Sequence, residues 1–288
     1  MQYNISNDFI EVTIKEHGAE LCSLKKANDS LEYMWQGNKK YWNRHAPILF
    51  PIVGKLLDDE YIYENRTYKM NQHGFARDMI FELFKKSDDS ICFKLQNSKD
   101  TLEIYPFKFE LYLTYTLVNN SLEISYKVIN KSKKDMLFSI GAHPAFNWPL
   151  ENENKNSYHF EFNDTKVLER LPLKKQGISE KVELISLENS TLTLNEALFK
   201  DDALVIQNLK NKEINLKSSK NSRYIKMAFK GFPYLGLWSK PTGAPFICIE
   251  PWHGVADFIG HNKKLENKKG IITLAKNEIF RSSYTISI

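Results

Sequence analysis

Cysteine is scarce in this sequence, and its cysteines are far apart. Cys22, Cys92 and Cys248 are the only three, and no CxxC pair is present. This spacing excludes a metal or redox site built on paired cysteines. Because each cysteine has apolar neighbours in the sequence, we expect buried, reduced thiols.

Several motifs that identify large enzyme classes are also missing. The sequence contains no GxSxG elbow, no HExxH pair and no glycine-rich phosphate loop. It has no apolar run of membrane-spanning length, and its first residues lack the basic and apolar regions of a signal peptide. We therefore expect a cytoplasmic protein that does not associate with a membrane.

The charge is nearly balanced. The 288 residues include 40 basic and 35 acidic side chains, for a net charge of +5. Many lysines lie in mixed patches such as 210–220 and 263–269, which are typical of solvated loops. Because no basic stripe with interleaved aromatic residues is present, a nucleic-acid partner is not expected.

Strand patterns dominate the chain. Short segments rich in Val, Ile, Phe, Tyr and Thr are separated by clusters of Asn, Asp, Lys, Ser and Gly, which is the pattern of strands and turns. These segments are 9–14, 21–25, 91–95, 107–118, 121–129, 158–162, 224–229, 246–250 and 282–288.

The connections between these segments favour antiparallel pairing. Asn119-Asn120 joins two strand segments and predicts a tight hairpin, because asparagine tolerates a positive φ. Only 195–199 and 255–259 are expected to form helical turns, and no longer segment has helical periodicity. The sequence thus predicts an all-β fold, a large antiparallel β-sandwich formed by residues 1–288 as a single domain.

Four segments place polar side chains in apolar or aromatic surroundings: 44–55, 71–78, 139–149 and 247–254. In the first, two prolines predict a loop or an edge strand. In the second, Arg77 and Asp78 can form an ion pair. In the third, His143 precedes a proline, which favours an extended backbone, and two small residues before it leave room for close approach.

The fourth segment ends a buried strand with Glu250. A buried carboxyl needs a partner or a ligand, and burial raises its pKa. Together with His73 and His143, it offers groups that can donate and accept protons near neutral pH. Trp148, Trp252 and Phe75 add flat apolar faces of the kind that stack on a sugar ring.

Zinc is the alternative interpretation of these residues. His73, His143 and Glu250 could bind a catalytic zinc ion from three distant strands. The sequence has no zinc motif to support this, so we predict no metal site and no cofactor.

Five stretches together resemble the aldose 1-epimerase (galactose mutarotase-like) family, especially its LacX-like branch. They are PILFPIVGK at 47–55, QHGFARD at 72–78, GAHPAFNWP at 141–149, FKDDAL at 199–204 and IEPWHG at 249–254. The resemblance implies a β-supersandwich with a carbohydrate cleft and cofactor-free interconversion of the α and β anomers of an aldose.

The resemblance also implies roles for individual residues. Glu250 would be the base at the C1 hydroxyl, and His143 would protonate the ring oxygen O5. His73 would bind and polarise the sugar near the same oxygens. Asp202 would bind sugar hydroxyls, with the adjacent Asp201 as the alternative.

One departure from the family leaves the substrate open. An arginine that usually contacts the sugar is replaced in the pattern by Lys55, with Arg77 as the alternative donor. Both residues, and Arg44, would also suit the phosphate of a hexose 6-phosphate. Free aldohexose is the first expectation, and hexose-6-phosphate mutarotase and a non-catalytic carbohydrate-binding protein are the alternatives. A monomer and a homodimer both remain open.

Overall fold

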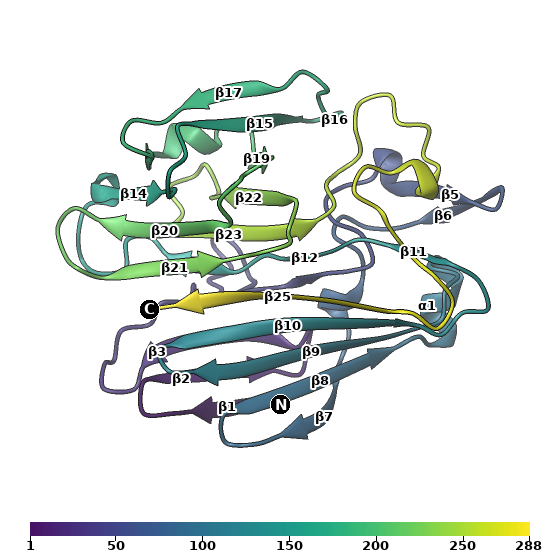
Figure 1. Ribbon diagram of the computed structural model, residues 1–288, viewed down its shortest axis with the longest axis horizontal. Helices are drawn as coiled ribbons and strands as arrows, with labels where there is room; N and C mark the ends of the chain where they lie inside the picture. Colours follow the sequence, from purple (N-terminus) through teal and green to yellow (C-terminus); the bar gives the residue numbers. More distant parts are fainter.

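The computed structural model describes all 288 residues, and most of its regular structure is β-strand (Figure 1). The first of two nine-stranded antiparallel sheets contains, in spatial order, β18 (Thr191–Thr193), β14 (Tyr158–Glu161), β20 (Glu213–Ser218), β21 (Tyr224–Ala228), β25 (Ile279–Ser287), β10 (Ser121–Asn130), β9 (Phe109–Val118), β8 (Ser90–Gln96) and β7 (Glu82–Lys86).

The second sheet includes the strand that carries the candidate residue Glu250. Its order is β16 (Gly177–Ile178), β15 (Val167–Lys174), β19 (Leu204–Gln207), β22 (Tyr234–Trp238), β23 (Phe246–His253), β12 (Ile140–Ala142) and β4 (Ile48–Leu49). In addition, β13 (Ala145–Asn147) pairs with β23, and β17 (Glu183–Ser186) pairs with β15.

Smaller elements complete the fold. Three short sheets are formed by β1 (Gln2–Ser6), β2 (Ile10–Lys15) and β3 (Glu20–Lys26), by β5 (Glu60–Tyr63) and β6 (Arg66–Lys69), and by β11 (Met136–Phe138) and β24 (Ile272–Leu274). Helical structure is limited to α1 (Lys99–Ile104) and the 3-10 turns η1 (Leu57–Asp59), η2 (Ala76–Asp78), η3 (Lys155–Ser157), η4 (Glu196–Phe199) and η5 (Leu265–Asn267). None of these helices is long and apolar enough to cross a membrane.

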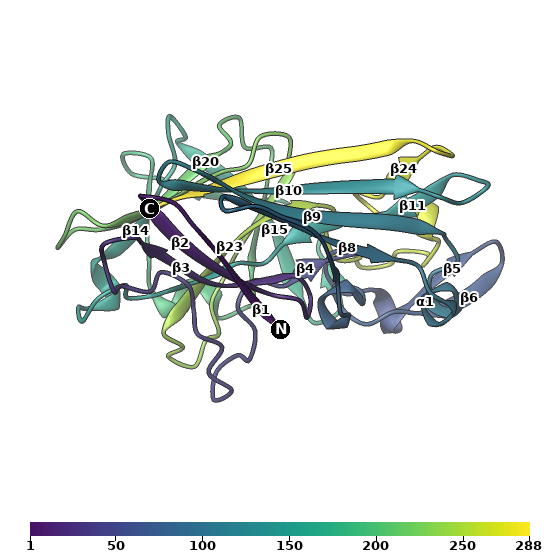
Figure 2. The same ribbon diagram turned by 90° about the horizontal axis from the view of Figure 1, so that it is seen from below.

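The main hydrophobic core lies between the two large sheets (Figure 2). Alternate residues of β10, such as Leu122 and Ile124, are buried in the same cluster as Ile247 and Ile249 of β23. This period-2 burial is expected of strands that turn one face to a core. The predicted antiparallel β-sandwich is confirmed.

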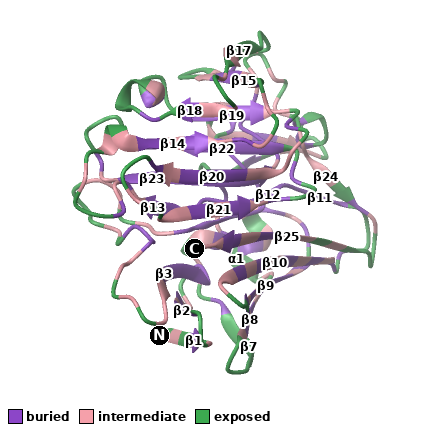
Figure 3. Ribbon diagram, turned by 60° about the vertical axis from the view of Figure 1, so that its left-hand side comes forward, coloured by how far each residue is buried: buried purple, intermediate pink, exposed green.

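Strand β23 is buried on both faces, although only one face meets the main core (Figure 3). Cys248, Glu250 and Trp252 point to the opposite face, outside that core. Loops cover this second face, which explains why the sequence of β23 is apolar at nearly every position instead of alternating. Glu250 and Trp252 therefore lie on the outer face of the second sheet.

The local predictions can be compared with these elements. The β9–β10 hairpin is confirmed, with Asn119 at φ 52°. The helical turn expected at 195–199 is present as η4, which Asn195 caps, but residues 255–259 form no helical turn. Their backbone instead bonds to neighbouring segments, with Asp257 N donating to the carbonyl of Lys55 and Ile259 N to that of Ile178.

Two further features differ from the sequence expectations. Helix α1 was not predicted, because six residues are too few to show periodicity, although Ser98 and Thr101 form a capping box at its start. All three cysteines are free, and Cys22 and Cys248 are buried, but Cys92 is only half-buried.

Candidate functional site

A cavity of about 870 Å³ opens over the outer face of the second sheet. Seven residues singled out from the sequence line it: Lys55, His73, Arg77, His143, Asp202, Glu250 and Trp252. They come from five separate segments of the chain, so only the fold brings them together. The volume lies within the range of pockets that bind small molecules.

The strand register places His143 opposite Glu250. Gly141 of β12 pairs with Trp252, and Ala145 of β13 pairs with Cys248, so the two short strands share one continuous register along β23. His143 lies in the break between β12 and β13, at the position that faces Glu250. The break, at a His-Pro pair, frees the histidine from the regular sheet.

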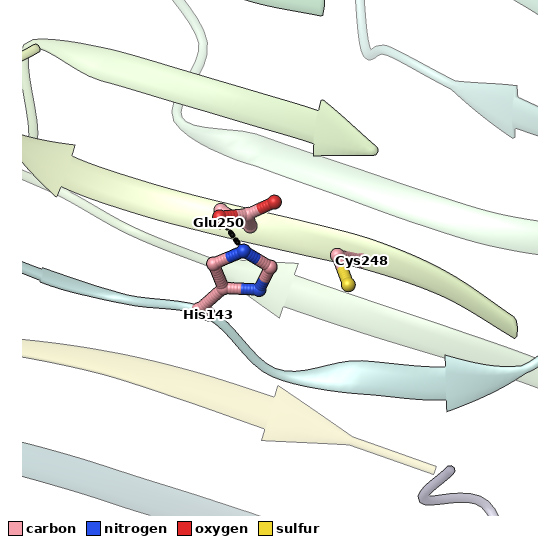
Figure 4. A group of neighbouring side chains, drawn as sticks. All are labelled: His143, Cys248 and Glu250. Carbon is pink, nitrogen blue, oxygen red and sulfur yellow. Dashed lines mark ion pairs between the residues drawn. The ribbon is translucent and has the colours of Figure 1, made fainter. Parts of the chain in front are cut away.

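The two side chains are in contact. His143 Nε2 lies 3.1 Å from Glu250 Oε2, and the glutamate side chain is only 1% exposed (Figure 4). No well-aligned hydrogen bond reaches either carboxyl oxygen or His143 Nδ1. A buried polar group without a partner is costly, and such groups are held in place where a ligand completes them.

Burial shifts the pKa values of this pair in opposite directions. Burial raises the pKa of Glu250 well above its usual range, and the nearby Asp202 carboxyl raises it further. Burial also lowers the pKa of His143 to about 3. In the ligand-free cavity the pair therefore holds one proton, carried by Glu250, and neither group is charged.

Two tryptophans pack around His143. Trp42 lies against its ring with centroids 4.9 Å apart, and Trp238 meets it edge-on at 5.7 Å. Both line the cavity, and neither was identified from the sequence. Trp42 follows a lysine- and asparagine-rich loop and Trp238 ends β22, so no local motif marks them.

His73 is fixed in one tautomer. Its Nδ1 accepts a hydrogen bond of 3.1 Å from the backbone N–H of Gly54, so in the neutral ring the hydrogen is on Nε2. Burial lowers the pKa of His73 well below its usual value, which keeps the ring neutral. Its ring lies 5.6 Å from that of His143. Its Nε2 lies 3.2 Å from the side-chain amide of Gln72, so this atom already has a protein neighbour beside the His143–Glu250 pair.

Trp252 forms an apolar floor next to Glu250. Its indole lies against the backbones of two glycines, because a Cβ on Gly141 would meet Cδ1 at 2.7 Å and one on Gly236 would meet Cζ2 at 2.5 Å. The indole N–H donates to the carbonyl of Ala142 at 3.1 Å. The small residues before His143 therefore make room for Trp252.

The structure separates the alternatives for the remaining polar positions. Both Asp201 and Asp202 are exposed, but only Asp202 lines the cavity. Lys55 is 58% exposed and pairs with Asp59 at 3.6 Å. The Arg77 side chain is only 16% exposed and its Nε has no hydrogen-bond partner. Arg77 is thus the more enclosed donor of the two.

The predicted sugar-stacking roles of Phe75 and Trp148 are corrected by their positions. Phe75 packs against Phe50, Tyr105 and Phe109 at the main core, and Trp148 is fully buried. Neither lines the cavity. Both are close in sequence to site residues, but their side chains point into the sandwich. Trp42 and Trp238 occupy the wall that these residues were expected to form.

The suggested zinc ligands do not come together as a set. The ligand atoms within 4.8 Å of one another belong to His143, Cys248 and Glu250, and His73 is not among them (Figure 4). Cys248 is fully buried, and burial raises the pKa of its thiol well above the usual value. Because a metal binds the thiolate and not the thiol, this burial disfavours the trio as a metal site.

Comparison with known proteins places this architecture in context. A sequence profile of the aldose 1-epimerase family matches residues 1–271. Protein LacX of Lactococcus lactis subsp. lactis, in plasmid and chromosomal forms, is 34% identical over all of this chain and 99% of its own length.

Solved structures agree with this match. A galactose mutarotase related enzyme from Lactobacillus acidophilus is 39% identical, with a TM-score of 0.96 over 100% of this chain and 97% of the other. A galactose mutarotase-like protein from Lactobacillus casei is 32% identical, with a TM-score of 0.92 over 100% and 99%.

Proposed function

Because the chain belongs to the aldose 1-epimerase family, we propose that it interconverts the α and β anomers of an aldohexose by acid–base opening and closing of the ring. The observation that carries the proposal is the contact between His143 Nε2 and Glu250 Oε2 in the floor of the cavity. No cofactor takes part in the proposed reaction, and the protein acts in the cytoplasm as a monomer or a homodimer.

The closeness of the two groups suits the chemistry. The proton leaves O1 and the ring breaks at O5, and both oxygens are bonded to the same carbon, C1. A base for O1 and an acid for O5 must therefore be neighbours. The reaction starts from the ion-pair form, in which the shared proton has moved from Glu250 to His143. Glu250 then takes the proton from O1, His143 gives its proton to O5, the C1–O5 bond breaks and C1=O1 forms.

Rotation about the C1–C2 bond then turns the other face of the aldehyde toward O5. His143 takes the proton back from O5, the C1–O5 bond reforms, and Glu250 returns its proton to O1. During the open-chain stage Glu250 is protonated and His143 is neutral. This is the protonation state that the buried site favours, so the environment stabilises the open-chain stage relative to the ion pair.

The other lining residues have binding roles in this proposal. His73 donates its Nε2–H to a sugar oxygen, and Asp202 accepts hydrogen bonds from sugar hydroxyls. Trp252 provides the apolar surface beneath the ring. Partial burial by the protein raises the pKa of Asp202, although the residue as a whole is exposed.

A non-catalytic carbohydrate-binding protein would use the same cavity, but it would not need a proton-sharing pair. The test is anomer exchange of α-glucose and α-galactose, measured by NMR or polarimetry, for the wild type, Glu250→Gln and a control. Glu103→Gln in α1 is a suitable control, because Glu103 is exposed and outside the cavity. Equal rates for the wild type and Glu250→Gln on every sugar tested would refute the proposed epimerase activity.

A further inference from the structure

A buried carboxylate lies outside the cavity, in the small sheet formed by β1, β2 and β3. Glu20 is the first residue of β3, and its side chain is only 4% exposed. It does not line the cavity. An acidic group is rarely buried so deeply without specific partners, so its contacts show which part of the structure it holds in place.

The Glu20 carboxylate binds two consecutive backbone N–H groups. Its Oε1 accepts from the N–H of His45 at 2.7 Å and from the N–H of Ala46 at 3.0 Å. Its Oε2 pairs with the ammonium of Lys15 at 2.5 Å. Residues 45–46 belong to no strand, so the carboxylate supplies the acceptor that a neighbouring strand would otherwise provide.

His45 is bonded in turn to the strand break that carries His143. The carbonyl of His45 accepts from the N–H of Ala145, two residues after His143, at 2.8 Å. The backbone of His143 itself forms no hydrogen bond with another main-chain group. Its position therefore depends on its neighbours, and His45 connects one of them directly to Glu20.

A second connection runs through Trp42, three residues before His45. The indole of Trp42 lies against the His143 ring, with centroids 4.9 Å apart and 31° between the planes. The carbonyl of Trp42 accepts from the indole N–H of Trp35 at 2.9 Å. The backbone N–H of Trp35 donates to the carbonyl of Ala145, also at 2.9 Å. The tryptophan that covers the histidine is thus fixed to the same short strand, β13.

The loop that carries this tryptophan, residues 37–46, is closed at its base. A Cβ on Gly37 would meet Cε1 of the His45 ring at 2.8 Å, so the two ends of the loop pack on each other. His45 Nδ1 lies 3.3 Å from the ammonium of Lys15, which also pairs with Glu20. Lys15 and Glu20 therefore hold the base of the loop from the small sheet.

We infer that Glu20 is a positioning residue that keeps His143 opposite Glu250 for the proposed reaction. It acts through His45 and through the loop that carries Trp42. The inference rests on the proposed function and adds a residue that supports it from outside the cavity. Because a misplacement of about 1 Å can lower a rate on the order of a hundredfold, an acid and a base 3.1 Å apart need such support.

The first experiment compares Glu20→Gln with Glu20→Met by NMR exchange of α-glucose and α-galactose. Glutamine keeps an oxygen that accepts from His45 and Ala46, whereas methionine has a similar length and only a weakly accepting sulfur. We expect kcat to fall about tenfold or more in Glu20→Met and less than about twofold in Glu20→Gln. KM should change less than kcat, because Glu20 lies outside the cavity. Unchanged kcat in Glu20→Met, or an equal loss in both variants, would overturn the inference.

The matched control is Tyr115→Phe. The hydroxyl of Tyr115 donates to the carbonyl of Ala19, next to Glu20, at 2.6 Å, so its loss also breaks a buried hydrogen bond in this region. The bonds to His45 and Ala46 stay in place. We expect kcat within about twofold of the wild type, with thermal unfolding recorded for both variants. A loss of kcat equal to that of Glu20→Met would assign the effect to general destabilisation and overturn the inference.

A shorter acidic side chain gives a second test of the same contact. Glu20→Asp keeps the charge but withdraws the carboxylate by one methylene from the N–H groups of His45 and Ala46. It replaces Glu20→Met if that variant does not fold. We expect kcat to fall about three- to tenfold, below that of Glu20→Gln, although only Glu20→Asp retains the charge. A higher kcat in Glu20→Asp than in Glu20→Gln would overturn the inference.

The last measurement does not depend on turnover. Packing on the Trp42 indole shifts the NMR resonance of the His143 Cε1–H group, which is assigned by its absence in His143→Gln. Trp42→Leu gives its position without the indole. In Glu20→Met we expect a shift toward that position, and in Glu20→Gln and Tyr115→Phe the wild-type position. An unshifted resonance in Glu20→Met would overturn the inference whether or not the wild type is active. A shifted resonance would support positioning of His143 by Glu20 even if the wild type proved inactive and the proposed function failed.

Discussion

His143 Nε2 and Glu250 Oε2 are 3.1 Å apart, and both side chains are almost fully shielded from solvent. His143, in the break between β12 and β13, lies directly opposite Glu250 of β23, and no space wide enough for a sugar ring separates the two side chains. This short separation suits a reaction in which the two groups act on O1 and O5, which are bonded to the same carbon, C1. It also makes the protonation of each group depend on the other, because only one proton is held between them.

Glu250→Gln is expected to abolish activity without loss of stability. In the folded protein the pKa of Glu250 is raised, so ionisation of this residue favours the unfolded state as pH rises above about 4.5. The free energy of unfolding of the variant should therefore equal or exceed that of the wild type at pH 7, by up to about 2 kcal/mol. Urea unfolding at several pH values measures this, with Glu103→Gln as the control. A variant less stable than the wild type at pH 7 would contradict the prediction.

The dependence of kcat/KM on pH should not show the change that titration of an ordinary histidine causes. Because burial lowers the pKa of His143 to about 3, a second proton enters the pair only in strong acid. Glu250 loses its proton only well above its usual range. We expect kcat/KM to be level between about pH 4.5 and 7. A fall centred near pH 6.5 would show that His143 titrates like an exposed histidine.

Gly236→Ala should damage the floor of the cavity. The new methyl group would lie 2.5 Å from the indole of Trp252 and force it to move. Overpacking of this kind costs about 1–3 kcal/mol of stability, and the displaced ring should raise KM several-fold. Thermal unfolding and kinetics measure both effects. Gly260→Ala has open space around it and should leave KM unchanged, although the φ of 82° at this position strains the new residue and costs some stability.

The aromatic residues should divide into two classes. Trp238→Leu is expected to raise KM or lower kcat about three- to tenfold, because Trp238 lines the cavity and packs on His143. Phe75→Leu should lower stability by about 1–3 kcal/mol and leave KM unchanged, because Phe75 packs at the core. Steady-state kinetics and urea unfolding of both variants test whether Trp238 acts in the cavity and Phe75 in the core. A higher KM in Phe75→Leu would contradict the prediction and would indicate that Phe75 contacts the sugar.

Removal of metal ions should not affect the rate. We expect the same kcat/KM before and after dialysis against EDTA, because the proposed steps use only Glu250 and His143 as proton carriers. Added zinc should also leave the rate unchanged, because burial of the Cys248 thiol disfavours metal binding by His143, Cys248 and Glu250. Loss of activity with EDTA and recovery with zinc would instead support a catalytic metal.

The sequence by itself determined the strands and the polar residue types of the site. Short β-branched and aromatic segments between polar turns specify antiparallel strands through local preference, and β9 and β10 were predicted almost to the residue. The apolar sequence around Glu250 and the proline after His143 marked both residues as candidates, because a polar side chain in such surroundings needs a partner or a ligand. These signals lie within a few residues of each other along the chain.

Only the tertiary structure decided which neighbours share the cavity. The register of β12 and β13 on β23 sets the contact between His143 and Glu250, and no local pattern encodes that pairing. Trp42 and Trp238 enter the wall from distant segments, while Phe75 and Trp148 turn into the core. The direction of a side chain depends on strand pairing and packing across the whole sandwich. For that reason the residue types could be read from the sequence, but their geometry could not.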